Sequence, residues 1–394
     1  MDMQTIMTTI AAISPARAWG IDVPNYFWFT GSSAAAFIIS SFAHVFGFKQ
    51  FKPIAGFSLL LAFVLLIVAP LNLIDDLKQP GRLVNFFLYG WENFGTSPMK
   101  WGVLLLMAYP TLIFFEALIL YRAYFVKKID NAGNFMQKVY KTLAFGRLGL
   151  DKENLEKDHR LGFILGAIGI PLALSVHGYT GYILGVVHAN VLWYTPLMPV
   201  LFLASAMVSG TGLLIVLLPI AQKFFSKARQ VDMDMMKRLA VLLSWFIVID
   251  LVIRVLWLSF AMPFGGATRE PLYQFFAMHS TMIIYVEYLL CLIVPMMVGF
   301  SKLKNYFWIV VSVGFISAVG VWLFRWNTVI GGQEIPRSMP GFMHYIPEIF
   351  GQNSIVSVSA NWALLIAMLS LIMVIFPWDE EMEDCYKGVN NGKK

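Results

Sequence analysis

The sequence predicts an all-α polytopic membrane protein with about nine transmembrane helices. Of its residues, 58% are hydrophobic and 13% are charged, whereas a soluble domain usually carries about 25% charged residues. Apolar runs of about 20 residues, the length that crosses a bilayer as a helix, recur along the 394-residue chain. The expected spans are residues 25–47, 53–74, 98–124, 160–187, 194–220, 238–262, 272–299, 306–330 and 353–377.

The distribution of Lys and Arg predicts the orientation of these spans. The connections after the odd-numbered spans are basic and include the long segment from Arg122 to Arg160. Under the positive-inside rule these connections are cytoplasmic, so the N-terminus lies outside and the C-terminus in the cytoplasm. The net charge of +6 follows from this topology, and we expect the lipid membrane, not a nucleic acid, as the surrounding partner.

This topology divides the chain into four segments. Residues 1–24 form an outer segment, which a short interfacial helix and a frayed terminus explain equally well, and which lacks the features of a cleaved signal peptide. Residues 25–220 form a first membrane bundle with spans one to five. Residues 221–377 form a second bundle with spans six to nine, and residues 378–394 form a cytoplasmic tail.

Two connections on the outer side are predicted to be ordered loops that dock a partner. They run from Asp75 to Pro98 and from Gly331 to Asn353, and both mix charged residues, turn residues and aromatics. Loops of this length that have no regular structure are often functional. A solvated connection is the alternative interpretation.

Ionisable residues inside the spans are the main functional signal. A charged side chain near the bilayer centre costs at least about 2.5–3.5 kcal/mol, so several of them together indicate that protons, ions or a polar headgroup are handled in the membrane. They are Glu116, His177, Asp250, Arg254, Glu287 and Arg325.

Several of these residues suggest a proton path. Asp250 and Arg254 are one helical turn apart with the acid first, the favourable order for an ion pair, and Glu287 lies at a similar depth. His279 and Arg325 continue the polar line outwards. The predicted path comprises Glu116, Asp250, Arg254, His279, Glu287 and Arg325. A purely structural ion network fits the same residues equally well.

A second group of polar residues predicts a quinone site at the outer side. A quinone headgroup needs a hydrogen-bond donor at each carbonyl and a group that takes its protons on oxidation. His177 and Asp76 are the candidate catalytic residues, and a single His on an apolar helix is more often a packing residue. The candidate ring contacts are Asn25, Tyr26, Trp28, Tyr179 and Thr180.

The chain is not expected to hold a metal or a redox centre of its own. Its only cysteines, Cys291 and Cys385, form no CxxC motif, which argues against an iron–sulfur cluster. His177 and His279 fall at comparable depth, but a di-haem membrane cytochrome needs a second matched pair, which the other histidines do not supply. We therefore expect no haem, iron–sulfur cluster or metal site.

Five short stretches carry a resemblance to a known family. They are Asp76–Pro80, Ser97–Gly102, Tyr179–Gly181, Trp193–Pro199 and Arg325–Gln333. In this order, and on these helices, they resemble the NrfD/PsrC family, the quinone-reactive membrane subunits of polysulfide-reductase-type complexes. The likeness covers nearly the whole membrane region.

Two positions depart from the family pattern. Lys78 and Gln79 stand where Gly and Arg are common, and Trp326 stands where Tyr is common. Both positions vary among members of the family, so the resemblance is little weakened.

The resemblance implies a menaquinol or ubiquinol site near the outer face, in a four-helix bundle made by the first four spans. Asn25, Tyr26, Asp76 and Tyr179 match the positions of the site, and His177 lies within one turn of Tyr179. It also implies a four-cluster ferredoxin-like iron–sulfur subunit on the outer face, which passes electrons to a molybdopterin or other catalytic subunit. The setting would be a bacterial or archaeal cytoplasmic (inner) membrane.

These observations predict the quinol-oxidising membrane subunit of a respiratory oxidoreductase, which would leave the chemistry on the terminal substrate to another subunit. Coupled proton movement is a separate hypothesis. Quinone reduction in the reverse direction, with electrons from a hydrogenase, would use the same parts. A proton-coupled secondary transporter also relies on buried ionisable residues but would work without an iron–sulfur partner. A passive anchor would bind no quinone.

Overall fold

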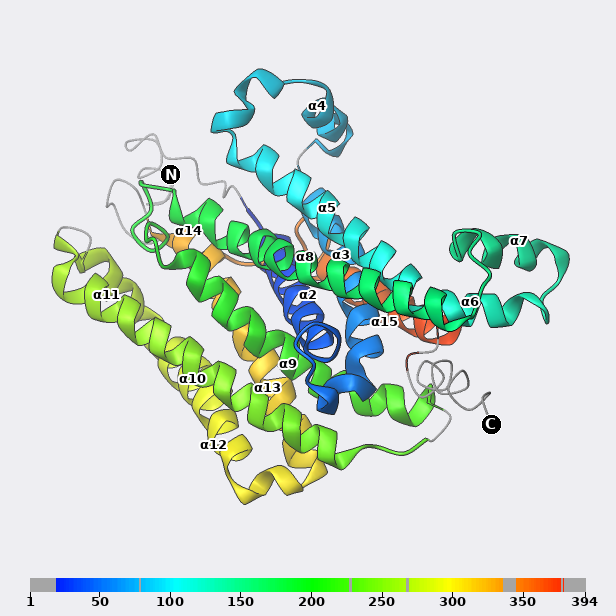
Figure 1. Ribbon diagram of the computed structural model, residues 1–394. Helices are drawn as coiled ribbons and strands as arrows, with labels where there is room; N and C mark the ends of the chain where they lie inside the picture. The colour runs from blue at the N-terminus through cyan, green and yellow to red at the C-terminus, as the bar shows by residue number, and fades with distance from the viewer. Residues whose placement is uncertain are drawn as a thin grey trace.

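The structure of the protein is a computed structural model that describes residues 19–77, 79–226, 229–266, 269–335, 345–376 and 378. Within these ranges the regular structure is helical (Figure 1), and eight helices are long and apolar enough to cross a membrane. The predicted class, an all-α polytopic membrane protein, is confirmed. Most of the predicted outer segment and of the predicted tail lies outside the described residues.

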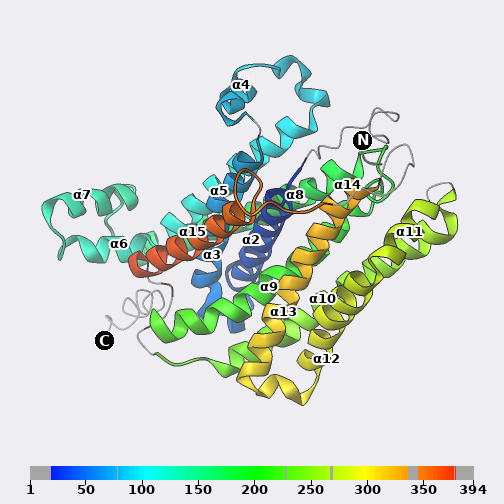
Figure 2. The same cartoon turned by 180° about the vertical axis from the view of Figure 1, so that it is seen from behind.

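The membrane region is built from long helices that alternate in direction (Figures 1 and 2). They are α2 (Asp22–His44), α3 (Lys52–Asp76), α5 (Pro98–Leu120), α8 (Lys152–Gly185), α9 (Met198–Phe224), α10 (Met233–Phe264), a π-helix (Thr281–Ile293) continued by α12 (Val294–Phe300), α13 (Phe307–Trp326) and α15 (Ile355–Ile375). Shorter helices connect them: α4 (Leu83–Leu88), α6 (Arg122–Ile129), α7 (Asn134–Leu143), α11 (Arg269–Met278) and α14 (Gly332–Glu334).

Helix α2 corresponds to the first predicted span and is not one of the eight apolar helices. It has 23 residues, but its Ser, Thr, Asn and Gly residues lower its hydropathy. Nearly all of it is buried, and it packs against α3, α8, α9 and α13. Because these helices separate α2 from the surroundings, its polar side chains do not face lipid. The other eight predicted spans correspond to the eight apolar helices.

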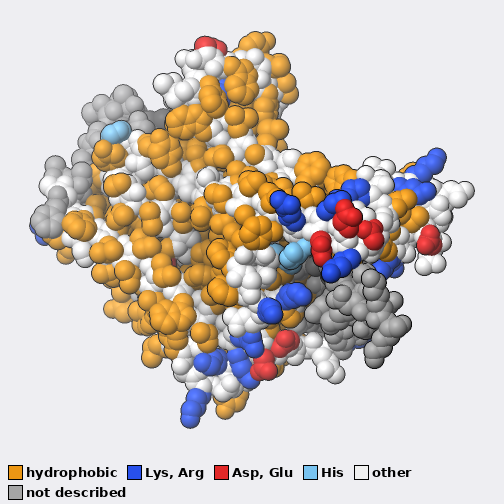
Figure 3. Space-filling model, viewed as in Figure 1, with side chains coloured by type: hydrophobic (Ala, Val, Ile, Leu, Met, Phe, Trp, Pro, Cys, Tyr) orange, Lys and Arg blue, Asp and Glu red, His pale blue; other side chains and the backbone are white. Residues whose placement is uncertain are grey.

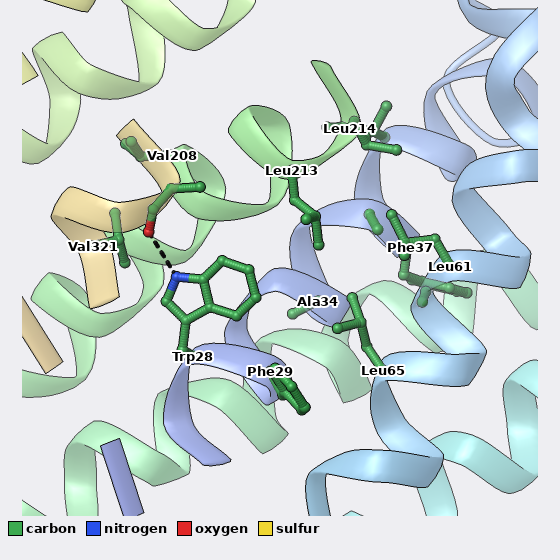
Figure 4. Packing of buried hydrophobic residues seen from close by; sticks show 14 of the residues in the cluster. Trp28, Phe29, Ala34, Phe37, Leu61, Leu65, Val208, Leu213, Leu214 and Val321 are labelled. Carbon is green, nitrogen blue, oxygen red and sulfur yellow. Dashed lines mark hydrogen bonds between the residues drawn. The ribbon is translucent and has the colours of Figure 1, made fainter. Parts of the chain in front are cut away.

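Apolar packing around α2 forms the core of the protein. Trp28 and Phe37 of α2 lie among Leu61 and Leu65 of α3 and Leu213 of α9 (Figure 4). The indole N–H of Trp28 also donates a hydrogen bond of 2.8 Å to the carbonyl of Ala318 on α13. Helices α2, α3, α5 and α8 each contact the next and close into a four-helix bundle.

The surface has the character expected of a membrane protein. On the face shown in Figure 3, hydrophobic side chains cover most of the area, and charged side chains gather near α6 and α7 and at the adjoining edge. Many large apolar side chains on α5, α8 and α10 are exposed, as lipid-facing residues are. The predicted outer end of the bundle, where α2 begins, lies opposite the end that carries α6 and α7 (Figures 1 and 2).

Close contact between α9 and α13 depends on Gly212. A Cβ atom at this position would lie 2.6 Å from the carbonyl oxygen of Gly314, so the two backbones approach as small residues allow in membrane helices. Gly212→Ala is therefore expected to destabilise the protein by about 1–3 kcal/mol through overpacking, measured as thermal unfolding in mild detergent. The matched control is Gly178→Ala, where the new Cβ would meet only Leu203 Cδ1, at 3.7 Å. Equal stability of the two variants would contradict this account.

Candidate functional site

An ionic cluster lies inside the membrane region between α10, the π-helix and α13. Arg254 donates from Nε to Asp250 Oδ2 over 2.7 Å, and from Nη1 to Glu287. All three side chains are at most 2% exposed. One guanidinium thus bonds to two carboxyl groups, so the structure brings together three of the residues predicted for the proton path.

Arg325 forms a second buried centre with His177. Its Nη2 donates to the carbonyl of Phe202 over 2.9 Å and to Ser205 Oγ over 2.8 Å, and it lies 3.2 Å from His177 Nε2. His177 Nε2 is also 2.9 Å from the Phe202 carbonyl, and Nδ1 is 3.3 Å from Thr180 Oγ1. Both ring nitrogens of His177 therefore contact protein groups in a fully buried setting.

Both centres contain buried polar atoms without a hydrogen-bond partner in the described part of the chain. Among the described residues, Nε and Nη1 of Arg325, Nη2 of Arg254 and Oδ1 of Asp250 are buried and have no hydrogen-bond partner. A buried charged group is stable only when its remaining donors and acceptors are satisfied. These atoms therefore suit a site where water or protons reach the charges.

Two π-helical stretches meet at the ionic cluster. The first, Thr281–Ile293, carries Glu287, and the second, Asn327–Gly331, begins with Asn327. Asn327 Nδ2 donates to Glu287 Oε2 over 2.7 Å. π-Helical turns are rare and occur frequently at functional sites. Asn327 belongs to the stretch Arg325–Gln333 that carries the family resemblance, but it was not among the residues predicted for the proton path.

A cavity of about 370 Å³ opens beside Asn327 at the predicted outer end. His279 and Glu334 line it and are joined by a contact of 2.9 Å between Nε2 and Oε2. Trp322 and Trp326 form another wall, with ring centroids 5.6 Å apart and planes at 25°. His279 thus pairs with Glu334, which was not predicted from the sequence, and Asn327 both lines the same cavity and bonds to Glu287 of the ionic cluster.

Glu116 is not brought together with the other residues of the predicted path. It lies on α5, which packs against α3 and α8, and its carboxyl group faces Gly166 of α8. It is 2% exposed, and its Oε2 has no hydrogen-bond partner within the part of the chain that the structure describes.

The predicted headgroup residues on α2 are engaged by neighbouring helices. Asn25 donates to Asn72 Oδ1 on α3 over 2.7 Å, and its Oδ1 accepts from the indoles of Trp362 on α15 over 2.9 Å and of Trp322 on α13 over 3.4 Å. Trp28 bonds to α13 (Figure 4), and its ring centroid lies 4.9 Å from that of Trp362. Tyr26 is buried with its carbonyl accepting from Thr30. Asn25 and Trp28 therefore share contacts with Trp362 and with α13.

Tyr179 and Asp76 lie on two other helices of the four-helix bundle, α8 and α3. The ring of Tyr179 on α8 packs against Gly102 of α5, where a Cβ atom would collide with it, and its side chain is partly exposed. Asp76, the last residue of α3, accepts a hydrogen bond of 3.0 Å from the backbone N–H of Gly20. Thr180 is turned inwards, where its hydroxyl donates to the carbonyl of His177.

A buried amide network extends from Asn25 across the predicted outer end. Asn361 on α15 donates to Asn72 Oδ1 over 3.1 Å and to Asp75 Oδ2 over 2.9 Å. Asn25, Asn72 and Asn361 therefore join α2, α3 and α15 through side chains that share the Asn72 oxygen. Asn72 and Asn361 were not among the site residues predicted from the sequence. Each is the single amide side chain within an apolar run, a feature that can be recognised in the sequence.

Comparisons with known proteins agree with the sequence resemblance. The sequence model of the family described as "Polysulphide reductase, NrfD" matches residues 11–337. The chain is 33% identical over 251 residues to a selenate reductase subunit of Mesobacillus selenatarsenatis, a match that covers 62% of this chain and 57% of that protein. The chain thus spans little more than half the length of that relative.

Two further relatives are matched over most of their length. The chain is 23% identical over 383 residues to the Hdr-like menaquinol oxidoreductase integral membrane subunit of Archaeoglobus fulgidus, covering 91% of this chain and 82% of that protein. It is 26% identical over 350 residues to a tetrathionate reductase subunit of Salmonella typhimurium, covering 88% of this chain and 89% of that protein.

Proposed function

Because the chain belongs to the polysulphide reductase NrfD family, we propose that it is the quinol-oxidising membrane subunit of a bacterial or archaeal reductase complex. It oxidises menaquinol or ubiquinol at the predicted outer end of the bundle formed by α2, α3, α5 and α8. The two electrons pass to an iron–sulfur subunit on the outer face, and from there to a molybdopterin or other catalytic subunit. The protein resides in the cytoplasmic membrane.

The observation that carries this proposal is the concentration of buried amides and carboxyl groups at one end of the bundle. Asn25 and Asn72 are fully buried amides there, and Asn361 joins Asn72 to the carboxyl group of Asp75, which is followed by Asp76 at the end of α3. Amides and hydroxyls supply the donors that a quinol ring needs, and carboxylates accept its protons. The relative named as a menaquinol oxidoreductase subunit supports the choice of ligand.

The predicted site residues take different roles in this proposal. Tyr179 contacts the ring from the α5–α8 side, and Asn25 and Tyr26 border it on α2. Asp76 receives the protons at the surface. His177, whose ring is already engaged by Phe202 and Thr180, positions α8 from inside, while Trp28 fixes α2 against α13.

The connection between α3 and α5 is proposed to dock the iron–sulfur subunit. Lys100 Nζ donates to the carbonyls of Phe86 over 2.9 Å and Tyr89 over 2.7 Å, which holds this connection on α5. Val84, Leu88 and Tyr89 are each at least 60% exposed. An ordered segment with exposed apolar side chains suits a protein interface. The second predicted docking connection lies partly outside the described residues.

The test is purification of the tagged chain from its native membrane in mild detergent. Co-purifying proteins are identified by mass spectrometry, and quinone is extracted from the sample and quantified. The expected result is an iron–sulfur partner together with bound quinone. A chain that purifies alone and without quinone would favour the transporter, and a complex without quinone would favour the passive anchor.

Proton movement through the ionic cluster is a second element of the proposal, supported by the Asn327 link from Glu287 to the cavity. Glu287→Gln keeps the shape of the side chain but removes its titratable group. The number of protons moved per quinol oxidised, measured as pH changes around proteoliposomes, is expected to fall to the value set by quinol chemistry alone. Glu270→Gln is the control, since Glu270 is exposed on α11. An unchanged ratio in Glu287→Gln would identify the cluster as structural.

A further inference from the structure

The cavity beside Asn327 has the size and walls of a binding site for a flat ring. Its volume of about 370 Å³ falls within the range of roughly 300–1,000 Å³ that is usual for small-molecule sites. The stacked indoles of Trp322 and Trp326 form one wall, and Phe275 and Leu323 add apolar surface. Aromatic walls with a few polar groups are typical of sites for planar organic ligands.

The polar end of the cavity can bind a hydroxyl or a carbonyl oxygen. His279 and Glu334 meet there at 2.9 Å, and Asn327 adds an amide. The Glu334 side chain is 10% exposed and that of His279 is 29% exposed, so His279 is the more accessible member of the pair. An imidazole oriented by a carboxylate is able to donate a hydrogen bond to a ring oxygen or to accept one from it.

The same lining disfavours other classes of ligand. Neither Lys nor Arg is among the residues that line the cavity in the described part of the chain, and the Glu334 carboxylate would repel a phosphate. No group of three or more His, Cys, Asp or Glu residues suited to a metal ion occurs among the described residues. A neutral ring with an oxygen substituent fits both the aromatic wall and the polar end of the cavity.

The exposed part of the cavity wall in the described chain, called its mouth below, is apolar. Met282 and Ile355 line the cavity there and are each 43% exposed. These side chains suit the entry of a hydrophobic ligand dissolved in the bilayer. The cavity is lined by residues of α11, the two π-helices, α13, α14 and α15 and by Ile21 and Pro347, and by none of α5 or α8, so it does not include Tyr179. It adjoins α2 at Asn25, whose Oδ1 accepts from Trp322 Nε1 over 3.4 Å.

We propose that this cavity is a second site for a quinone or quinol headgroup, held by the indoles of Trp322 and Trp326 and hydrogen-bonded to the His279–Glu334 pair. The proposal rests on the proposed function for the availability of quinone in the same membrane. Because Asn327 joins the cavity to Glu287, the ring in this site lies next to the ionic cluster.

Ile355→Trp tests the proposal by filling the mouth of the cavity. The purified complex is reconstituted into quinone-free nanodiscs and titrated with a radiolabelled short-chain naphthoquinone. The wild type is expected to bind two equivalents per copy of this chain, and Ile355→Trp one. Ile366→Trp is the matched control, since Ile366 is exposed on the same helix but does not line the cavity, and it should retain two. Glu334→Gln should weaken one of the two sites about tenfold, the effect of losing a hydrogen bond to a charged group.

Each outcome separates this inference from the proposed function. One equivalent in the wild type that persists in Ile355→Trp would overturn the second site and leave the proposed site intact. One equivalent that disappears in Ile355→Trp would support the cavity and overturn the site at Tyr179. Two equivalents that persist in Ile355→Trp and bind with unchanged affinity in Glu334→Gln would overturn the inference.

Discussion

Replacing Arg254 with glutamine is expected to destabilise the protein by about 3–5 kcal/mol, because it leaves two buried carboxylates without their cation. Asp250 and Glu287 both bond to this one guanidinium, and all three side chains are almost completely buried. The measurement is the free energy of unfolding in detergent, from thermal or denaturant titration of the purified protein. Arg254→Lys keeps the charge but loses the planar guanidinium whose N–H groups reach both carboxylates. We therefore expect a loss of stability smaller than that of Arg254→Gln.

The matched control for Arg254→Gln is Arg238→Gln on the same helix. Arg238 is exposed and bonds only weakly, to Gln50 over 3.1 Å, so the change should stay within about 0.5 kcal/mol. Combining Arg254→Gln with Asp250→Asn should cost less than the sum of the single changes, since the double variant leaves one carboxylate, Glu287, without its cation instead of two. Equal effects of Arg254→Gln and Arg238→Gln, or strict additivity, would show that the cluster is not coupled.

Tyr179→Phe is expected to lower quinol oxidation by about a hundredfold, the effect of losing one well-placed donor at a reacting oxygen. Its ring packs against Gly102, so the phenylalanine ring fills the same space and only the hydroxyl is lost. Assembly of the complex and its thermal stability should therefore not change. The measurement is the steady-state rate with a short-chain menaquinol and an artificial electron acceptor, in the purified complex.

Tyr182→Phe provides the comparison for this result. Tyr182 lies one turn further along α8 and is 37% exposed, so removing its hydroxyl should leave the rate within about twofold of the wild type. If Tyr179→Phe turns over at the wild-type rate, the proposed site in this bundle is wrong. If both variants lose activity equally, the outer half of α8 contributes through its overall polarity and not through one hydroxyl.

The fold was largely predictable from the sequence because hydropathy acts locally. Eight predicted spans match apolar helices whose exposed faces are hydrophobic. The pair Asp250 and Arg254 was predictable for the same reason, since both lie on one helix with one turn between them. Periodicity predicts which residues of one helix lie next to each other. It does not predict which other helices pack against them.

The contacts between helices were the part that the sequence could not supply. Glu334 and Asn327 contact His279 and Glu287 across different helices, and Glu287 and Asn327 lie in π-helical stretches, which no simple pattern predicts. Asn25 and Trp28, three residues apart on α2, do share one side of the helix, where both contact Trp362 of α15. Tyr26 is the next residue after Asn25 and is therefore rotated by about 100° from it around the helix.

The polarity of α2 has a consequence for biogenesis. This helix is tolerated in the bilayer because α3, α8, α9 and α13 surround it, yet all four are synthesised after it. A segment rich in Ser, Thr, Gly and Asn partitions into lipid less readily than one made of Leu and Ile. Stable integration of α2 thus depends on the helices that follow it, and a nascent chain that ends before α9 would hold α2 in the membrane only weakly. Insertion and tertiary folding of this protein are therefore coupled events.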